Sequence, residues 1–324
     1  MNEKLINNTG EKIMSRNTNT EHIKFPVELR PLYTKGKEYS RLSHYSAVTG
    51  MIEKEEKVFS VVSRDYTLIL NEEAIEIGKS IFKKIFPESG DEDFTVFNIV
   101  YPSTRSYCHI DLINKYYTLN IWGEEVYIPF IRITNSYNKT KKLRFELGFC
   151  RKVCDNGVIF EREFVSFNYV HYRKSIGNIK KITVNDLKLK DLKLIENRFI
   201  KYMNNLKETK IKEKYFIAVV ATIFGLKFNT ENVSDRYLKI IEKQKEEFLN
   251  IMERLKRKYT GELGENAYSL FNTATAFVNE TEFVNRVRYN DYQTKAGKWV
   301  KKMIRIENEE LIQEYLNNCM NSLK

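Results

Sequence analysis

Hydrophobic and polar residues follow one period in the first half of the chain and another in the second. From Phe25 to about Tyr172 the apolar runs are short, rich in β-branched and aromatic residues, and separated by turn residues. Such runs are typical of β-strands. After about Lys181 apolar residues recur every three or four positions, as in helices that bury one face. The pattern predicts an α+β fold, with an antiparallel β-rich N-terminal half that contains one early helix, followed by a helical C-terminal half.

The early helix is predicted at residues 71–86. Asn71 can cap its N-terminus, two glutamates lie in its first turn, and Pro87 ends it. Around this helix, strands are predicted at 58–70, 94–101, 105–113, 116–122, 126–134, 142–153 and 163–172.

In the second half, the run 213–226 is apolar on too many faces for an exposed helix, so we expect it to be buried. Ser234 can cap a long amphipathic helix at 234–259. Further helices are predicted at 184–206, at 265–280 and from about 296 towards the C-terminus. The expected organisation is a flexible polar tail at 1–24, a β-rich domain at 25–182 and a helical region at 183–324.

Composition places the chain among globular proteins, because 42% of the residues are hydrophobic and 30% are charged. The longest apolar run, 216–226, is too short to cross a bilayer. The N-terminus contains no apolar stretch typical of a signal peptide. Together with four cysteines at no recognisable spacing, these features predict a cytoplasmic protein without a membrane partner.

Positive charge is concentrated in one part of the chain. The net charge is +11, and residues 132–193 contain 15 Lys and Arg against six Asp and Glu, a difference of +9. A concentrated basic region attracts polyanions through counterion release, which favours a nucleic-acid partner. An AT-rich gene also enriches lysine, so the excess charge by itself leaves a non-functional origin open.

Cys150 and Cys154 could belong to a metal site, a redox pair or a nucleophilic site. A structural zinc site needs about four ligands, and the remaining cysteines and histidines show no matching spacing. In a strand, residues four apart lie about 13 Å apart, beyond disulfide reach. Cys108 and His109 are adjacent, so a strand would point them to opposite faces. We therefore expect buried thiols, no metal, no cofactor and no catalytic residue.

The dipeptide Asn156-Gly157 lies between two apolar runs, which predicts a β-hairpin with a two-residue type I′ turn. Arg144, Arg151 and Lys152 would decorate this hairpin and make it basic.

Aromatic residues interleave with the cations of this region, as in sheets that bind single strands. Tyr137, Tyr169 and Tyr172 are the candidates for exposed rings, because they lie in a turn or beside basic residues. The predicted nucleic-acid contacts are Lys139, Lys141, Lys142, Arg144, Arg151, Lys152, Arg173, Lys174, Lys180, Lys181, Tyr137 and Tyr172.

Four ordered segments carry a family resemblance. Residues 131–160 contain the matching positions Thr134, Asn135, Ser136, Tyr137, Arg151, Val153, Cys154, Asn156 and Gly157. Residues 61–82, 170–179 (which keep His171) and 265–280 contain further matches. The chain thereby resembles the domain of unknown function 932, or phage/plasmid-like protein, family, although Asn138-Lys139 replaces its usual Asp-Gly. The resemblance implies a protein of a phage, prophage or plasmid and brings no set of catalytic residues.

Three functions follow as hypotheses. The first is a non-catalytic protein that binds nucleic acid, in particular single-stranded DNA, during replication or recombination of a mobile element. The alternative is a protein-interaction module, such as an inhibitor of a host anti-phage defence complex. The third, an enzyme, would require Cys154, His171, Asn135 and Asn156 to converge in space. Self-association and binding to a host or phage protein complex remain open.

Overall fold

The computed structural model describes residues 18–36, 38–152, 157–160, 166–171, 192–228, 234–280, 288–306 and 308–323. Contacts divide the chain into two compact units. Unit 1 comprises Met1–Tyr116, Phe130–Glu146 and Ser166–Leu189, and unit 2 comprises Tyr117–Pro129, Leu147–Val165 and Lys190–Lys324. The predicted boundary at 182 and the first 17 residues of the predicted tail lie outside the described residues.

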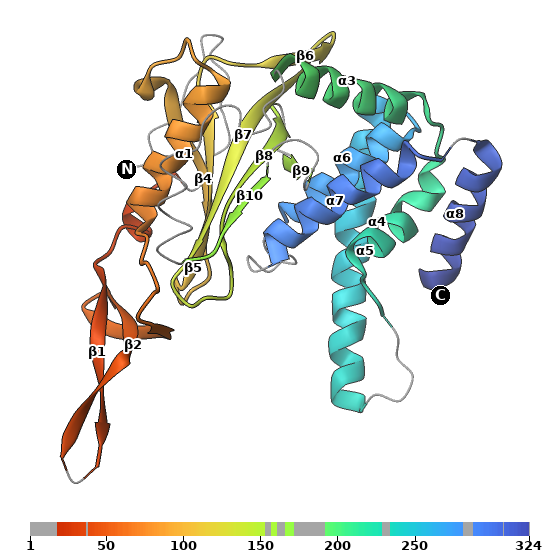
Figure 1. Ribbon diagram of the computed structural model, residues 1–324. Helices are drawn as coiled ribbons and strands as arrows, with labels where there is room; N and C mark the ends of the chain where they lie inside the picture. Colours follow the sequence, from red (N-terminus) through yellow and green to blue (C-terminus); the bar gives the residue numbers. More distant parts are fainter. Residues whose placement is uncertain are drawn as a thin grey trace. The chain divides into compact units, whose positions relative to one another are not determined.

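A three-stranded antiparallel sheet in unit 1 has the order β1-β2-β3 (Figure 1). Its strands are β1 (Val27–Lys35), β2 (Tyr39–Ile52) and β3 (Glu55–Ser63), after a short helix η1 (Thr20–His22). β3 pairs with β2 only between Tyr45 and Ile52. The outer part of the β1–β2 hairpin therefore has no third strand beside it.

The second sheet has seven strands in the order β10-β8-β7-β5-β4, with β6 paired to β7 and β9 paired to β8. They are β4 (Phe94–Val100), β5 (Tyr107–Asn114), β6 (Leu119–Trp122), β7 (Glu125–Ser136), β8 (Leu143–Arg151), β9 (Gly157–Ile159) and β10 (Ser166–Tyr169). The described pairings are antiparallel, which confirms the predicted β-rich half.

Helix α1 (Asn71–Ile85) packs one face of this sheet in unit 1 (Figure 1). A Cβ atom at Gly78 would lie 2.4 Å from Ile133 Cδ1 and 3.2 Å from Leu112 Cδ1, so the helix approaches the strands closely. The predicted cap is wrong: the N-cap is Leu70, and the Asn71 side chain makes no capping hydrogen bond. Instead, the amide of Asn71 is buried between the helix and β7.

The face of the sheet opposite α1 carries a buried polar row, because strand residues alternate between faces. Arg132 on β7 donates to Asp111 on β5 through Nε (2.6 Å) and Nη2 (2.7 Å), and both side chains are nearly inaccessible. In the neighbouring pair, His109 Nδ1 and Thr134 Oγ1 lie 2.8 Å apart. Burial and nearby cations, including Arg132, hold the pKa of His109 well below its usual value.

The predicted β8–β9 hairpin is present, but its turn differs from the prediction. Gly157 pairs with Cys150 and Val158 pairs with Phe149, so Gly157 belongs to the second strand. A two-residue turn centred on Asn156-Gly157 would instead place residue 158 opposite residue 155. The connection is therefore longer than predicted. Cys150 is buried, as expected, whereas Cys154 and Asn156 lie outside the described residues.

Helices make up most of unit 2. They are α3 (Leu192–Glu208), α4 (Phe216–Phe224), α5 (Asp235–Leu263), α6 (Ala267–Val278), α7 (Tyr289–Met303) and α8 (Glu309–Leu323), and short 3-10 helices lie at η2 (Asp91–Asp93) in unit 1 and η3 (Glu213–Tyr215) in unit 2. The apolar helix α4 is largely buried and every residue of α6 is buried. The single C-terminal helix that we predicted is two helices, α7 and α8.

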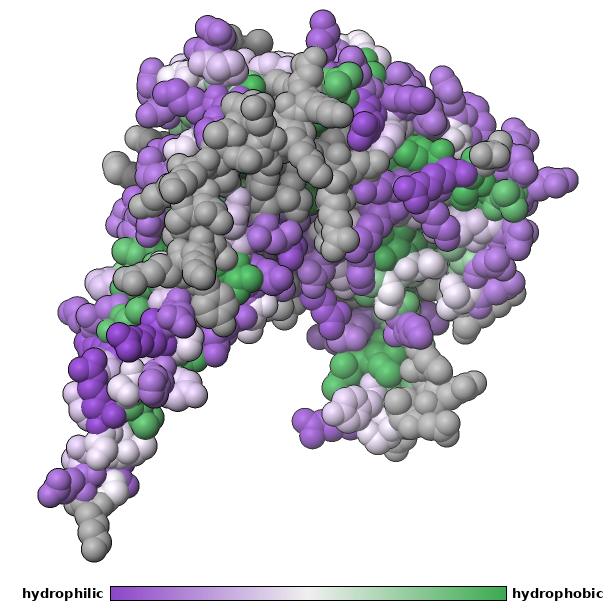
Figure 2. Space-filling model, viewed as in Figure 1, coloured by the Kyte–Doolittle hydropathy of each residue, from purple (hydrophilic) through white to green (hydrophobic). Residues whose placement is uncertain are grey.

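The surface in Figure 2 is mainly hydrophilic, with hydrophobic residues interspersed over the three-stranded sheet. The exposed large apolar residues of that sheet are Leu29, Leu42, Met51, Val58 and Val61. In the part of the chain that the structure describes, no helix combines the length and the apolar character that crossing a membrane requires.

Candidate nucleic-acid interface

The loop between β7 and β8 carries three of the predicted cationic contacts, Lys139, Lys141 and Lys142, and has a defined shape. Asn138 Oδ1 accepts hydrogen bonds from Ser136 Oγ (2.9 Å) and from the backbone N–H of Thr140 (3.1 Å). The Asn138 amide in turn donates to Ser106 Oγ (2.9 Å) on the segment before β5. Because an Asn side chain that bonds two residues ahead mimics a backbone turn, these bonds fix the path of the lysine loop.

Tyr137 anchors this loop and is not exposed, which corrects our prediction. Its ring is 2% exposed and packs in an apolar cluster with Val27, Val48 and Val62 of the three-stranded sheet. Its hydroxyl oxygen accepts from the backbone N–H of Asn71 (3.1 Å). Burial raises the pKa of this hydroxyl. Tyr137 therefore joins β7 to the three-stranded sheet and to α1, and its ring is not available for stacking on a base.

Asn135 lies just before Tyr137 and is equally structural. Its fully buried amide donates to Ile69 O (2.9 Å) and to Asn71 Oδ1 (2.9 Å). The Cys108 thiol donates to the same Asn71 oxygen (3.2 Å), and burial raises the pKa of that thiol to about 12. The family-motif residue Asn135 thus holds the start of α1 against β7, and Cys108 is an unreactive buried thiol.

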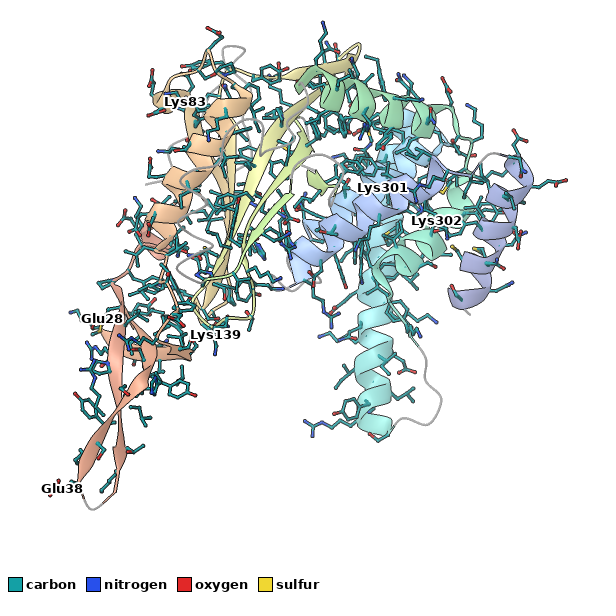
Figure 3. The ribbon with its side chains drawn as sticks, in the orientation of Figure 1. Glu28, Glu38, Lys83, Lys139, Lys301 and Lys302 are labelled. Atoms are coloured by element: carbon teal, nitrogen blue, oxygen red, sulfur yellow. The ribbon has the colours of Figure 1, made fainter. Side chains whose placement is uncertain are left out.

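A groove of about 440 Å³ in unit 1 brings the lysine loop together with the three-stranded sheet. The Lys139 ammonium donates to Val61 O of β3 (2.6 Å), and Figure 3 labels Lys139 beside that sheet. Lys141 Nζ lies 5.8 Å from the centre of the Tyr107 ring, and Lys142 is exposed. The groove is lined by Tyr45, Val61, Val62, Ser63, Tyr66, Lys139, Lys141, Lys142, Val170 and His171.

His171 forms part of the wall of this groove. Its ring stacks on Tyr66, with centroids 5.2 Å apart and an interplanar angle of 11°. His171 Nδ1 lies 3.2 Å from Thr67 O, and the Thr67 N–H donates to His171 O (3.0 Å). Burial lowers the pKa of His171 and raises that of Tyr66 to about 12. Both rings are therefore neutral at neutral pH, and the positive charge of the groove comes from its lysines.

Comparison with protein families decides the classification. The family described as Domain of unknown function (DUF932) matches residues 58–302, most of the chain. The chain belongs to the DUF932 family. Comparisons with curated proteins and with solved structures found no significant match. The match covers the lysine loop, β3 from Val58 onwards and His171, whereas β1, β2 and Tyr45 precede it.

The remaining described contacts that we predicted for this DUF932 protein are divided between the two units. Arg151 is buried in unit 2, where its Nε donates to Glu125 Oε2 (2.7 Å). Our expectation that Arg151 decorates an exposed basic hairpin is therefore wrong, because a carboxylate neutralises it inside the protein. Arg144 is partly buried and lies 3.5 Å from Glu146, and Lys152 is exposed in unit 2.

Two further predicted residues lie on strands of the seven-stranded sheet. Gly157 is buried at the start of β9, and Tyr169 is partly exposed at the end of β10. The residues that lie outside the described part of the chain are Cys154, Asn156, Tyr172, Arg173, Lys174, Lys180 and Lys181. Among the described residues, no group of three or more His, Cys, Asp and Glu side chains could hold a metal ion.

Sequence reasoning missed the tyrosines of the groove, Tyr45 and Tyr66. A signal for Tyr45 was present: tyrosines recur every six residues at 33, 39 and 45, and Lys35 and Arg41 lie between them. Tyr66 and His171 both lie at positions that match the family resemblance, but only the fold brings their rings together.

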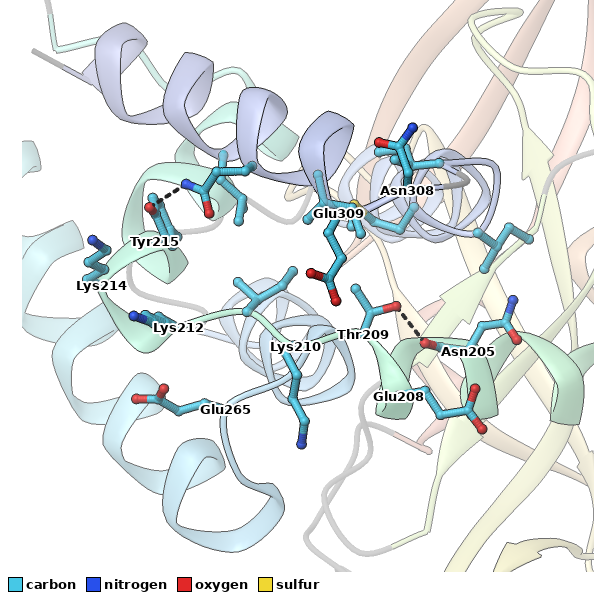
Figure 4. A pocket seen from close by; sticks show the side chains of 17 residues that line it. Asn205, Glu208, Thr209, Lys210, Lys212, Lys214, Tyr215, Glu265, Asn308 and Glu309 are labelled. Atoms are coloured by element: carbon cyan, nitrogen blue, oxygen red, sulfur yellow. Dashed lines mark hydrogen bonds between the residues drawn. The ribbon is translucent and has the colours of Figure 1, made fainter.

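A larger cavity of about 830 Å³ lies within unit 2, between the end of α3, η3 and the start of α8 (Figure 4). Its charged lining residues are Lys210, Lys212, Lys214, Glu208, Glu265 and Glu309. In Figure 4 the Glu309 side chain points towards the loop that carries the lysines. Because three carboxylates balance three ammonium groups, this cavity does not favour a polyanion, in contrast to the groove in unit 1.

Proposed function

We propose that this DUF932 protein binds single-stranded nucleic acid without catalysis, as an accessory protein in the replication or recombination of a phage or plasmid. The observation that carries the proposal is the convergence of Lys139, Lys141 and Lys142 on one groove with the exposed ring of Tyr45. The mobile-element context rests on the family resemblance.

The charges along the groove suit a phosphate chain. Among the described residues that line it, there are three lysines and no Asp or Glu. Lys139 uses one of its three N–H donors on Val61 O, so two donors remain for a ligand. Each lysine that neutralises a phosphate releases counterions, and this release drives binding that weakens as salt is added.

The rest of the lining suits bases. Tyr45 is 52% exposed, and an exposed tyrosine offers a stacking face to any base. Val61, which is 46% exposed, and the stacked pair of Tyr66 and His171 add apolar surface. Cations beside aromatic and apolar groups are the combination by which proteins bind single strands without sequence preference.

Replacement of the three loop lysines tests the proposal. We expect K139Q/K141Q/K142Q to raise the Kd for a fluorescent oligothymidylate at low salt, measured by fluorescence anisotropy. The slope of log K against log salt should fall by about 2, because each single-strand phosphate contact contributes about 0.7.

A matched control distinguishes the contribution of the groove lysines to binding from that of overall charge. The variant K239Q/K243Q/K245Q removes the same three charges from exposed positions of α5 and should bind like the wild type. Equal weakening by both triple variants would show that overall charge, and not the groove, attracts the strand. A wild-type protein that binds no oligonucleotide at low salt would overturn the proposed function and favour the protein-interaction alternative.

A further inference from the structure

The outer part of the β1–β2 hairpin forms a two-stranded ribbon, defined here as residues 31–46 (Figure 1). β3 joins only from Tyr45 onwards. Residues 33–36 and 38–45 are all exposed, so neither face of the outer ribbon is covered by the described residues. The ribbon contains Lys35, Lys37 and Arg41 against the single acid Glu38, and its net charge is therefore positive.

One face of this ribbon combines two tyrosines with two cations. Tyr33 pairs with Arg41, and Lys35 pairs with Tyr39. Cross-strand partners share a face, as do residues two apart on one strand. Each tyrosine therefore has a cation beside it along its own strand and another across the hairpin. The opposite face carries the pair Thr34 and Ser40, whose side chains are small.

Folding does not account for this face. Tyr33 is 56% exposed and Tyr39 is 72% exposed. Within the described chain, the side chains of Tyr33, Lys35, Tyr39 and Arg41 make no hydrogen bond, ion pair or ring contact. The rings and charges are thus available to a ligand, and these exposed side chains contribute nothing to the core.

We propose that this face of the ribbon contacts unpaired bases: Tyr33 and Tyr39 stack on bases, while Lys35 and Arg41 hold the adjoining phosphates. This inference rests on the proposed nucleic-acid-binding function and assigns its preference for single strands to the ribbon. A tyrosine ring can stack only on a base whose flat face is open, and duplex DNA presents base edges in its grooves.

The ribbon is continuous with the groove through β2, which contains both Tyr39 and Tyr45. Six residues of extended strand span about 20 Å, equal to about six stacked nucleotides at 3.4 Å each. A single-stranded nucleic acid of about six nucleotides can therefore contact both the ribbon and the groove. The ribbon precedes residues 58–302, so this contact is a feature of the chain beyond the part that the family match covers.

Full-length protein and an oligonucleotide that contains 2-aminopurine test the stacking directly, because stacking quenches the fluorescence of this base. Wild-type protein should quench it. We expect Y33V/Y39V, which keeps good strand-forming residues, to lose the quenching and to raise the Kd for the single strand about 30-fold or more. Binding to the matched duplex should stay unchanged.

Two further variants keep the test decisive if the tyrosine variant perturbs the hairpin. T34A/S40A alters the same two strands on the opposite face and should bind and quench like the wild type. K35Q/R41Q should keep the quenching but reduce the salt slope of single-strand binding by about 1.4, corresponding to two phosphate contacts.

The outcomes separate this inference from the proposed function. If Y33V/Y39V binds and quenches like the wild type while K139Q/K141Q/K142Q is weakened, the ribbon contact is overturned and the proposed function stands. Equal weakening by T34A/S40A, or an equal loss of duplex binding in Y33V/Y39V, also overturns the ribbon contact. Absence of all binding by the wild type overturns both.

Discussion

At the scale of single residues, the motif that resembles the family has a structural explanation. Asn135 holds α1, Ser136 and Asn138 shape the lysine loop, and Tyr137 enters the apolar cluster of the three-stranded sheet. Each of these side chains contacts another part of the protein. They position Lys139 and the lysines that follow it, which are the proposed nucleic-acid contacts.

The Asp111–Arg132 pair is a residue-scale feature with a large expected effect on stability. D111N removes the carboxylate charge that Arg132 contacts in the sheet interior, so we expect the free energy of unfolding to fall by about 3–5 kcal/mol. Urea denaturation measures this change. D91N is the matched control, because Asp91 pairs with Lys83 in solvent, where ion pairs contribute little. If D111N and D91N lower the free energy of unfolding by similar amounts, burial does not make the Asp111–Arg132 pair more important for stability.

At this scale, the sequence could not show whether a given side chain points to solvent or into the core. Tyr137 follows a strand end, and a one-position difference in register decides whether a side chain faces solvent or core. Arg151 looked like a surface cation because its partner Glu125 lies 26 positions earlier and only the fold brings them together. The buried Cys150 was predicted correctly, since cysteine spacing already argued against a metal site.

At the scale of elements, periodicity predicted the type of most helices and strands, and local chemistry misled at their ends. Asn71 is a residue type that often caps helices, but its side-chain amide accepts a hydrogen bond from Asn135 on β7 instead. The division between α7 and α8 lies at residues 304–308, where no Pro or Gly interrupts the sequence. The ribbon was not recognised because its strands expose both faces, so they lack the alternation that a half-buried strand shows.

The contact between α7 and β9 gives an element-scale prediction. A Cβ atom at Gly297 would lie 2.2 Å from the backbone oxygen of Ile159, and backbone cannot rotate away as a side chain can. We expect G297A to lower the free energy of unfolding by about 1–3 kcal/mol, although alanine favours a helix over glycine by about 1 kcal/mol.

Gly261 provides the control within the same unit. It lies in α5, and a Cβ atom added there would meet none of the described atoms within 4 Å. G261A should therefore raise the free energy of unfolding by about 0.5–1 kcal/mol. Thermal or urea denaturation compares the two variants. If G297A and G261A both stabilise the protein, α7 does not approach β9 as closely as described.

At the scale of the whole molecule, the groove shows why the proposed binding site was only partly predictable from the sequence. Its lysines are near neighbours in the chain and were predicted as a cluster. Its remaining walls come from Tyr45, from residues 61–66 and from residues 170–171, which only tertiary folding assembles. The +9 charge of residues 132–193 overstated the basic surface, because Arg132 and Arg151 are neutralised in buried ion pairs.

Stability of the folded protein should depend on pH through two buried histidines. Burial lowers the pKa of His109 and of His171 in the folded state, whereas an unfolded histidine has a pKa of about 6.5. As pH falls below about 6.5, the unfolded chain therefore binds protons first, and the folded state loses stability. The stabilisation is fully present above that pH.

We expect the urea midpoint to fall between about pH 7.5 and 5.5, with a limiting slope of up to about 1.4 kcal/mol per pH unit for each histidine. The variant H109Q/H171Q should flatten this dependence in the same window. An unchanged slope in the double variant would show that other groups cause the acid sensitivity.

The hydrogen bond from Lys139 to Val61 O has a consequence for solubility. β3 lies at the border of its sheet, and strands in that position can recruit another chain through their unoccupied backbone groups. An ammonium group seated on one of these carbonyls blocks such recruitment and adds a repelling charge. Lys139 thus protects the edge of β3 against pairing with another chain, in addition to its proposed contact with a phosphate chain.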